Sequence, residues 1–157
     1  MQNLLRFLKE NIRLLVGALV VLFIGLLIIT FIMSKQATQV SINDKSFNVK
    51  IAKSEKDRQI GLSKTEQIAE NQGMLFIFDK ADFHSFWMKE MKFPIDIIYI
   101  NGDKVTTVIE NAKPGITDAD LEIYQPDEAS DKVLEVNAGI AKKYNIKKGT
   151  LIKTRSF

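Results

Sequence analysis

The segment HSFWMKEMKFPIDIIYI, residues 84–100, holds the highest density of side chains that could do chemistry. It contains the only His and the only Trp of the 157-residue chain, together with Lys89 and Asp96. Imidazole, carboxylate and ammonium groups can transfer protons, and an indole ring can stack on an apolar ligand or a cation. The segment therefore predicts either a functional site or a pair of strands with one structural carboxylate.

Two carboxylates in predicted strands, Asp96 and Glu135, are the most informative candidates. A carboxylate in a strand loses hydration free energy unless it is paired or hydrogen-bonded, and Lys89 and Arg58 are natural partners. Two interpretations stay open. Either Asp96 ties down a loop and Glu135 lies at a strand edge in water, or both belong to a polar cluster that contacts a ligand.

We take Trp87, Lys89, Asp96, Glu135 and Arg58 as the candidate ligand-binding residues and assign none of them a catalytic role. An enzymatic alternative is a hydrolase of envelope material, in which Asp96 and Glu135 form a general acid–base pair. Carboxyl groups more than about 10 Å apart would exceed both common glycosidase geometries. The separation of these two groups therefore tests the alternative.

Several other reaction classes are disfavoured. The chain has no Cys, which excludes a thiolate nucleophile and a Cys-containing zinc site. Its glycines form neither a phosphate-binding loop nor a dinucleotide fingerprint. If residues 83–88 form one strand, Ser85 points away from His84, and Met88 lies about 13 Å from His84 at ~3.3 Å per residue, too far for a shared copper ion. No metal or other cofactor is predicted.

The N-terminal region predicts a membrane anchor. Residues 14–33, LLVGALVVLFIGLLIITFIM, carry no charge. As a helix this run would be roughly 30 Å long, which matches the hydrocarbon core of a bilayer. It is longer than a cleaved signal core and no small-x-small cleavage site follows it, so we expect an uncleaved transmembrane signal-anchor.

Charge around this run predicts the topology. Arg6, Lys9 and Arg13 oppose only Glu10, so residues 1–13 are expected in the cytoplasm, followed by a linker over residues 34–39 and an extracytoplasmic domain over residues 40–157. These first residues carry +2 of the net charge of +3. The near-neutral remainder disfavours nucleic acid as a partner. The expected partners are the membrane and a small ligand or envelope component.

Period-2 patterns dominate the predicted domain and indicate a mainly β fold, either a compact sandwich or a partly open barrel. Asn101-Gly102 between two apolar runs is a strong hairpin signal. Residues 40–42 and 46–52 are expected to pair across Asn43-Asp44-Lys45. Ser54, Ser63 with Glu66, and Asn137 are capping candidates that predict short helices over residues 55–61, 64–70 and 138–144. Asn145 suits a left-handed stop after the last of these helices, and residues 111–129 are expected to form a loop. The predicted strands are residues 40–42, 46–52, 73–78, 83–88, 95–100, 103–110, 132–136 and 150–154.

Three blocks, DRQIGLS, GMLFIFDKADFHSFWMKEMKFPIDIIYI and YQPDEASDKVLEVNAGIAKKYNIKKGT, resemble in order those of the family called domain of unknown function 192. Ser63, Glu90 and Met91 depart from the family pattern. The resemblance implies a compact β-rich fold, frequent export and membrane attachment, and no established activity. The matching positions are Arg58, Gly61, Leu62, Gly73–Phe76, Phe78, Phe86–Lys89, Pro94, Asp96, Leu134, Glu135 and Gly139.

Three functions are consistent with these observations. The domain is predicted to be a binding module for a small molecule, a glycan or a peptide. The alternatives are the hydrolase that uses Asp96 and Glu135, and a structural partner of another membrane protein. The anchor helix has no G-x-x-x-G motif, so its self-association is not indicated.

Overall fold

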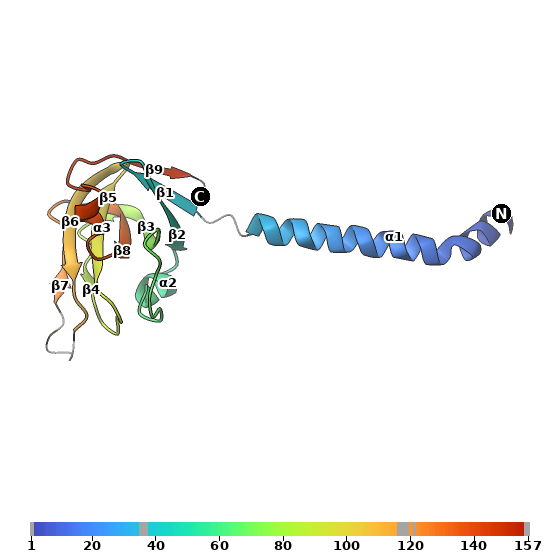
Figure 1. Cartoon of the computed structure of the whole chain (residues 1–157), viewed down its shortest axis with the longest axis horizontal. Helices are drawn as coiled ribbons and strands as arrows, with labels where there is room; N and C mark the ends of the chain where they lie inside the picture. The colour runs from blue at the N-terminus through green and yellow to red at the C-terminus, as the bar shows by residue number, and fades with distance from the viewer. Residues whose placement is uncertain (1, 35–37, 116–119, 121, 156–157) are drawn as a thin grey trace. The chain divides into compact units, whose positions relative to one another are not determined.

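The computed structural model describes residues 2–34, 38–115, 120 and 122–155. The chain forms two compact units, Met1–Gln36 and Ala37–Phe157 (Figure 1). Residues 35–37 of the predicted linker and 116–119 and 121 of the predicted loop lie outside the described residues.

The described residues of the first unit form one helix, α1 (Gln2–Ser34). Among the side chains that the structure describes, many large apolar ones along α1 are exposed, including Leu14, Leu19, Leu22 and Phe23. No helix within the described part of the chain is long and apolar enough to cross a membrane. The structure therefore confirms a helix at this position and does not support its transmembrane assignment over residues 14–33.

The second unit is a curled seven-stranded sheet with the strand order β6-β5-β8-β3-β2-β1-β9 (Figure 1). The start of β6 meets the chain just before β9, where Lys104 bridges Leu151 and Val105 N donates to Thr150 O over 2.9 Å. This contact curls the sheet into a half-barrel, and the mainly β prediction is confirmed. The strands of this sheet are β1 (Thr38–Ile42), β2 (Lys45–Ala52), β3 (Gln72–Asp82), β5 (Ile95–Asn101), β6 (Lys104–Ala112), β8 (Ser130–Asn137) and β9 (Ile152–Arg155).

Two hydrophobic cores cover the two faces of the sheet, because successive side chains of a strand point in opposite directions. In β5 and β8, Ile98, Leu134 and Val136 enter the first core, whereas Ile97 and Val133 enter the second. A two-stranded ribbon of β4 (Phe86–Trp87) and β7 (Ile123–Tyr124) contributes Phe86 and Tyr124 to the second core. β7 falls within the predicted loop, and β4 is much shorter than the predicted strand over residues 83–88.

The hairpin turns follow the polar residues identified in the sequence. Asn43 and Asp44, between β1 and β2, both have a positive φ, 45° and 64°. The second hairpin is also confirmed, but its turn lies one residue later than expected: Asn101 pairs with Lys104, so Gly102 and Asp103 form the turn. Gly102, with φ 62°, supplies the left-handed conformation there.

Two of the three predicted helices form. Helix α2 (Glu55–Ile60) begins at Ser54, whose hydroxyl accepts a hydrogen bond from Asp57 N over 3.1 Å. Helix α3 (Ile140–Lys143) is followed by Asn145 with φ 50°, the predicted left-handed stop. Its N-cap is Gly139 rather than the predicted Asn137.

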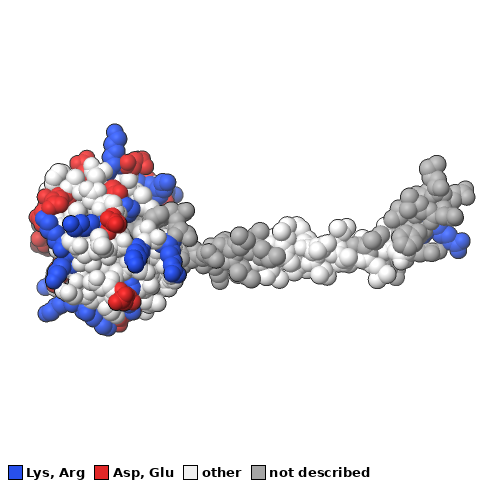
Figure 2. All heavy atoms as spheres, turned by 90° about the horizontal axis from the view of Figure 1, so that it is seen from above, with Lys and Arg blue, Asp and Glu red and all other residues white. Residues whose placement is uncertain are grey.

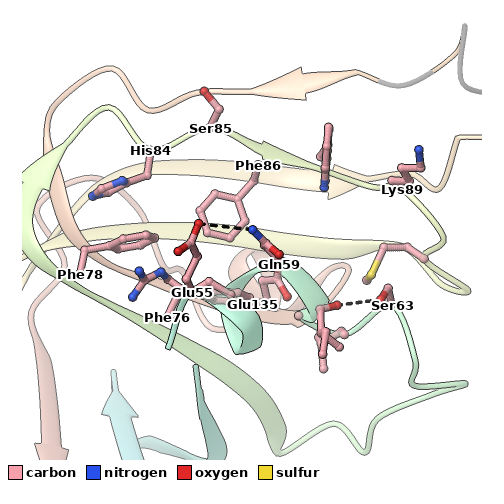
Figure 3. A pocket seen from close by; sticks show the side chains of 16 residues that line it. Glu55, Gln59, Ser63, Phe76, Phe78, His84, Ser85, Phe86, Lys89 and Glu135 are labelled. Carbon is pink, nitrogen blue, oxygen red and sulfur yellow. Dashed lines mark hydrogen bonds between the residues drawn. The ribbon is translucent and has the colours of Figure 1, made fainter. Parts of the chain in front are cut away.

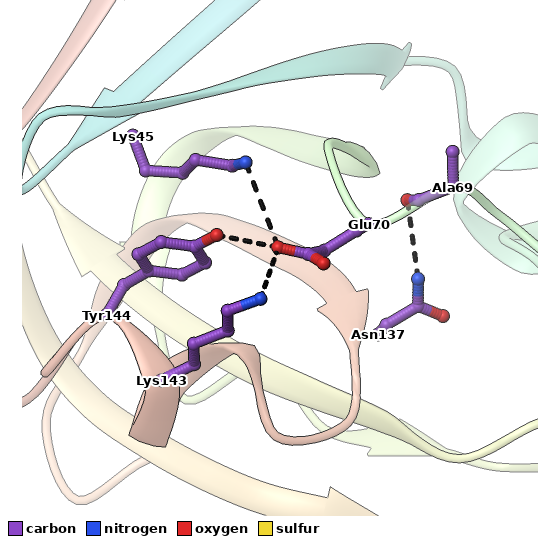
Figure 4. A network of polar contacts seen from close by, with 6 residues as sticks. All are labelled: Lys45, Ala69, Glu70, Asn137, Lys143 and Tyr144. Carbon is purple, nitrogen blue, oxygen red and sulfur yellow. Dashed lines mark hydrogen bonds and ion pairs between the residues drawn. The ribbon is translucent and has the colours of Figure 1, made fainter.

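The predicted helix over residues 64–70 is wrong, because tertiary contacts hold this segment as an irregular connection to β3. Asn137 Nδ2 donates to Ile68 O over 3.0 Å and to Ala69 O over 3.3 Å. Glu70 accepts hydrogen bonds from Lys143 Nζ at 2.8 Å and Tyr144 Oη at 2.6 Å (Figure 4). The connection is thus fastened to β8 and α3, and these partners hold the pKa of Glu70 down at about 2, chiefly through the Lys143 hydrogen bond.

Asp96 joins three elements inside the first core. It is fully buried, and its two carboxylate oxygens accept hydrogen bonds from Asn111 N and Ala141 N, both over 2.8 Å. Asn111 adopts φ 56° at the end of β6, and Ala141 lies in the first turn of α3. The side chain therefore links β5 to β6 and α3 through backbone donors, and the described hydrogen bonds replace the cationic partner expected from the sequence.

We expect Asp96→Ala to lower the free energy of unfolding by roughly 2–5 kcal/mol, because two backbone N–H groups lose their acceptor. Asp96→Asn should cost less, since its amide oxygen still satisfies one of them. Urea unfolding of both variants measures the effect. Asp79→Ala, at an exposed position of β3, is the control and should change stability by no more than about 0.5 kcal/mol. Unfolding curves for Asp96→Ala that overlay those of the control would contradict this role.

Candidate functional site

A pocket of about 330 Å³ opens between α2 and residues 84–91, which are called the segment around β4 below. It lies above the second core. In Figure 3, Glu55 and Gln59 of α2 lie on one side of it, and Ser85, Phe86 and Lys89 lie on the other. Its volume is at the lower end of the range for small-molecule sites. The described residues that line it are Glu55, Arg58, Gln59, Ile60, Gly61, Leu62, Ser63, Phe76, Phe78, His84, Ser85, Phe86, Trp87, Lys89, Met91 and Glu135.

Four of the five candidate residues from the sequence line this one pocket, namely Arg58, Trp87, Lys89 and Glu135. They come from α2, the segment around β4, and β8, which are far apart along the chain. Asp96 is the exception, since it lies in the first core on the opposite face of the sheet. Asp96 pairs with Val136 across the β5–β8 ladder and Glu135 pairs with Ile97, so the two carboxylates point in opposite directions. They do not form the acid–base pair of the hydrolase alternative.

Glu135 lies on the sheet face that forms the floor of the pocket. Its residue is only 5% exposed, and its Oε2 is buried without a hydrogen-bond partner. Among the residues that the structure describes, no other buried side-chain nitrogen or oxygen lacks a hydrogen-bond partner. Because its surroundings are apolar, burial raises the pKa of Glu135 to about 8. Near pH 7 the group is therefore a neutral carboxylic acid, which can donate one hydrogen bond and accept others.

The close packing of β3 against β8 fixes the backbone of Glu135. Gly73 pairs with Val136, and a methyl group at Gly73 would lie only 2.4 Å from the carbonyl oxygen of Glu135. Such a contact is far below the van der Waals distance between carbon and oxygen, so this position requires glycine. The position of Glu135 at the floor of the pocket is therefore fixed by this close backbone packing and by the hydrogen bonds between β3 and β8.

Aromatic side chains form much of the wall. His84 stacks on Phe78 with ring centroids 3.5 Å apart, and the Arg58 guanidinium lies 5.1 Å from the Phe78 ring centre. Arg58 Nη1 also donates to the carbonyl oxygens of Lys53 and of Ile77, the latter over 3.2 Å. Arg58 is therefore anchored by backbone acceptors and a ring, so it is a fixed part of the wall. No sequence pattern marks these contacts, because both acceptors are backbone carbonyls, which every residue carries.

Trp87 lies at the open side of the pocket and is 58% exposed. Its cross-strand partner in the β4–β7 ribbon, Ile123, is 64% exposed. Lys64 and Glu90 form an ion pair at 2.8 Å that joins the connection after α2 to the segment after β4. These two segments also supply Ser63 and Met91 to the pocket lining, so the ion pair ties two of its walls together.

The described residues contain no group of three or more His, Cys, Asp or Glu side chains that could hold a metal ion. His84 Nε2 lies 3.2 Å from the backbone carbonyl of Lys80, and its ring is stacked on Phe78. Met88 is buried in the second core, with 2% exposed. Packing and a backbone contact therefore account for the two side chains that were considered as copper ligands.

The sequence model of the family DUF192, described as an uncharacterized ACR, matches residues 38–154. The chain belongs to this family. The match covers the described sheet except for Arg155 at the end of β9, and it covers every residue that lines the pocket. It bears out the resemblance of the three sequence blocks. Among curated proteins, none matches the chain.

Two solved structures have a similar fold. One is a protein of unknown function from Novosphingobium aromaticivorans DSM 12444, with 26% identity, a TM-score of 0.66 and coverage of 74% of this chain and 83% of that one. The other is a putative transcription regulator from Sinorhizobium meliloti 1021, with 27% identity, a TM-score of 0.67 and coverage of 74% of this chain and 91% of that one. Neither description supplies a ligand.

The raised pKa of Glu135 predicts that stability falls as pH rises. Between the ordinary value of 4.5 and about 8, the folded protein retains a proton that the unfolded chain has lost. The free energy of unfolding should therefore decrease by about 1.4 kcal/mol per pH unit from this group, and the decrease should stop above pH 8. Glu135→Gln, which cannot ionise, should remove this part of the slope.

Urea unfolding between pH 5 and 9 measures the difference between the two proteins. Glu110→Gln, at an exposed position of β6, is the matched control and should keep the slope of the unmodified chain. Parallel stability profiles for the unmodified chain and Glu135→Gln would show that Glu135 is not a buried acid.

Proposed function

We propose that the domain is a binding module that holds a small molecule in the pocket between α2 and the segment around β4. The observation that carries this proposal is Glu135, a buried carboxyl group with an unpartnered oxygen at the floor of a pocket that is open to solvent. A ligand that hydrogen-bonds to this oxygen would complete its bonding.

The energetic cost of Glu135 supports a functional role. An unpaired buried polar group costs about 1–3 kcal/mol, and an apolar side chain of similar volume at such a position is often neutral or stabilising. Buried polar groups of native proteins are normally satisfied. An ionisable group with a perturbed pKa in a cleft is a characteristic of functional sites.

The competing functions receive less support. The hydrolase alternative needs its two carboxylates, Asp96 and Glu135, at one site, but only Glu135 of this pair lies at the pocket. Asp96 accepts hydrogen bonds from two backbone N–H groups on the other face of the sheet. Transcription regulation, suggested by the description of the Sinorhizobium protein, would call for a concentration of basic residues. On the face drawn in Figure 2, Lys and Arg side chains of the domain are interspersed with Asp and Glu.

The location of the domain is also part of the proposal and rests on the sequence of the first unit. Residues 14–33 carry no charge, and basic residues precede them. The exposed apolar side chains of α1 would leave a large apolar surface in water, and such surfaces normally contact a membrane or another protein. We propose that α1 anchors the chain at the cytoplasmic membrane with the domain outside.

Ligand binding can be followed at the pocket itself, because Trp87 is the only Trp of the chain. We expect at least one member of a chemically diverse library to change the Trp87 emission saturably and to raise the melting temperature of the full-length protein. A ligand at 100 times its Kd adds about 2.7 kcal/mol of stability. A library in which no compound does both would contradict the binding function.

Variants test whether the pocket is the site. Trp87→Ala should leave the melting temperature of the free protein nearly unchanged, because most of this residue is exposed, and should abolish the ligand-induced shift. Leu151→Ala removes another large exposed side chain, 61% accessible and outside the pocket lining, and should keep the shift. Equal shifts for the two variants would place binding elsewhere.

The location is tested with a reporter fused after Phe157 that is active only outside the cytoplasm. We expect activity from the full chain, recovery of the protein in the membrane fraction after alkaline carbonate extraction, and no loss of the N-terminal segment. Replacing two central apolar residues of α1 by Arg, as in Leu22→Arg with Ile24→Arg, should release the protein. Reporter activity in the cytoplasm alone, or a soluble full-length chain, would overturn the anchor.

A further inference from the structure

We infer that the ligand class of this pocket is a saccharide, bound as a polyhydroxylated ring whose apolar face stacks on Trp87 and whose hydroxyl groups reach Glu135 and the polar side chains of α2. This inference rests on the proposed binding function and specifies the chemistry of the ligand.

The size of the pocket suits a single ring. A single hexose ring with its substituents is smaller than the pocket volume of about 330 Å³ and can enter it whole. The lower limit of ordinary ligand pockets is near this volume. A longer glycan would extend past Trp87 toward the exposed side chain of Ile123.

The wall combines apolar surfaces with planar polar groups. A sugar ring has one face of C–H groups, which can bury apolar area against an exposed indole such as Trp87. Gln59 Nε2 contacts Glu55 Oε1 at 3.5 Å, so an amide and a carboxylate are held side by side on α2. Together with the hydroxyl of Ser63, these groups supply both donors and acceptors to a ring of hydroxyl groups.

Glu135 completes the match. Its buried Oε2 lacks a partner, and a hydroxyl group is both donor and acceptor, so it can pair with the carboxyl group in either protonation state. A ligand that offers no hydrogen bond at this point would leave the oxygen unsatisfied and would lose affinity.

The charges around the pocket disfavour the main competitor, an ammonium group held by the aromatic wall and Glu135. The charged or titratable groups that line the pocket are Glu55 and Arg58 from α2, His84 and Lys89 from the segment around β4, and Glu135 from β8. Tyr99 of β5 also interacts with Glu135. Arg58 and Lys89 would repel a cation, whereas a neutral polyol does not need Glu135 to ionise.

The test titrates the full-length protein with methyl glycosides of common hexoses and N-acetylhexosamines. Tetrahydropyran, the same ring without hydroxyl groups, and benzylamine, an aromatic cation, are the comparison probes. We expect at least one glycoside to shift the Trp87 emission saturably, tetrahydropyran to bind at least 100-fold more weakly, and benzylamine to bind more weakly than the glycoside.

Two substitutions at the floor of the pocket separate hydrogen bonding from charge. Glu135→Gln keeps hydrogen-bonding capacity and should retain glycoside affinity within about threefold. Glu135→Leu keeps the volume and should weaken binding at least tenfold, as expected for the loss of a buried hydrogen bond. Its melting temperature at pH 8 should match or exceed that of the unmodified chain, because a buried ionisable group is removed. Loss of binding would then not reflect unfolding.

The possible results distinguish this inference from the binding function. Tighter binding of benzylamine that disappears in Glu135→Gln would replace the saccharide by a cationic ligand and leave the binding function intact. Unchanged glycoside affinity in Glu135→Leu would also overturn the saccharide inference. If no glycoside binds, the saccharide class is wrong, and the diverse library then decides whether the pocket binds anything else.

Discussion

The antiparallel pairing of β5 with β8 is the constraint on which the rest of this domain depends. Asp96 lies opposite Val136, and Ile97 lies opposite Glu135. Because side chains alternate between the faces of a sheet, this register sends one carboxylate into each of the two cores. A slip of one residue in either strand would exchange the side chains of its two faces and move its acidic group into the other core. The same ladder thus determines the packing and the placement of both acidic groups.

The two carboxylates meet opposite conditions in those cores. Asp96 accepts two backbone hydrogen bonds of 2.8 Å and thereby fastens a left-handed residue of β6 and the first turn of α3. Glu135 has apolar neighbours on its face of the sheet, and one of its oxygens has no partner. Burial with compensating donors makes a carboxylate a structural fastener, whereas burial without them raises its pKa and leaves a group that can bind a ligand.

Much of the fold could be predicted from local sequence patterns. Period-2 alternation, the Asn43-Asp44 turn and the Ser54 cap each depend on residues close in the chain, and each has the expected structure. The failures arise where distant contacts override a local preference. Ser63 and Glu66 have the spacing of a capping box, yet the Ser63 hydroxyl donates to Ile60 O, and side chains from β8 and α3 hold the following connection.

Most residues of the candidate site could be identified from the sequence, but their relative placement and their hydrogen-bond partners could not. Strand alternation could place Asp96 with Ile98 and Glu135 with Val133, but only the register between β5 and β8 reveals that these pairs lie on opposite faces. The partners of Asp96 are backbone N–H groups, which every residue carries, so no sequence pattern marks them. A search for a cationic partner therefore could not find the contacts that satisfy it.

Two residues that depart from the family pattern, Ser63 and Met91, both line the pocket. A hydroxyl group and a flexible thioether change the polarity and the shape of the wall, while Glu135 at the floor and Trp87 at the entrance keep the positions of the pattern. The third departure, Glu90, pairs with Lys64 and joins the segments that carry the other two. Since a ligand's hydroxyl groups must meet partners at fixed distances, these wall residues would select among ligands of one chemical class, and Glu135 and Trp87 would select the class itself.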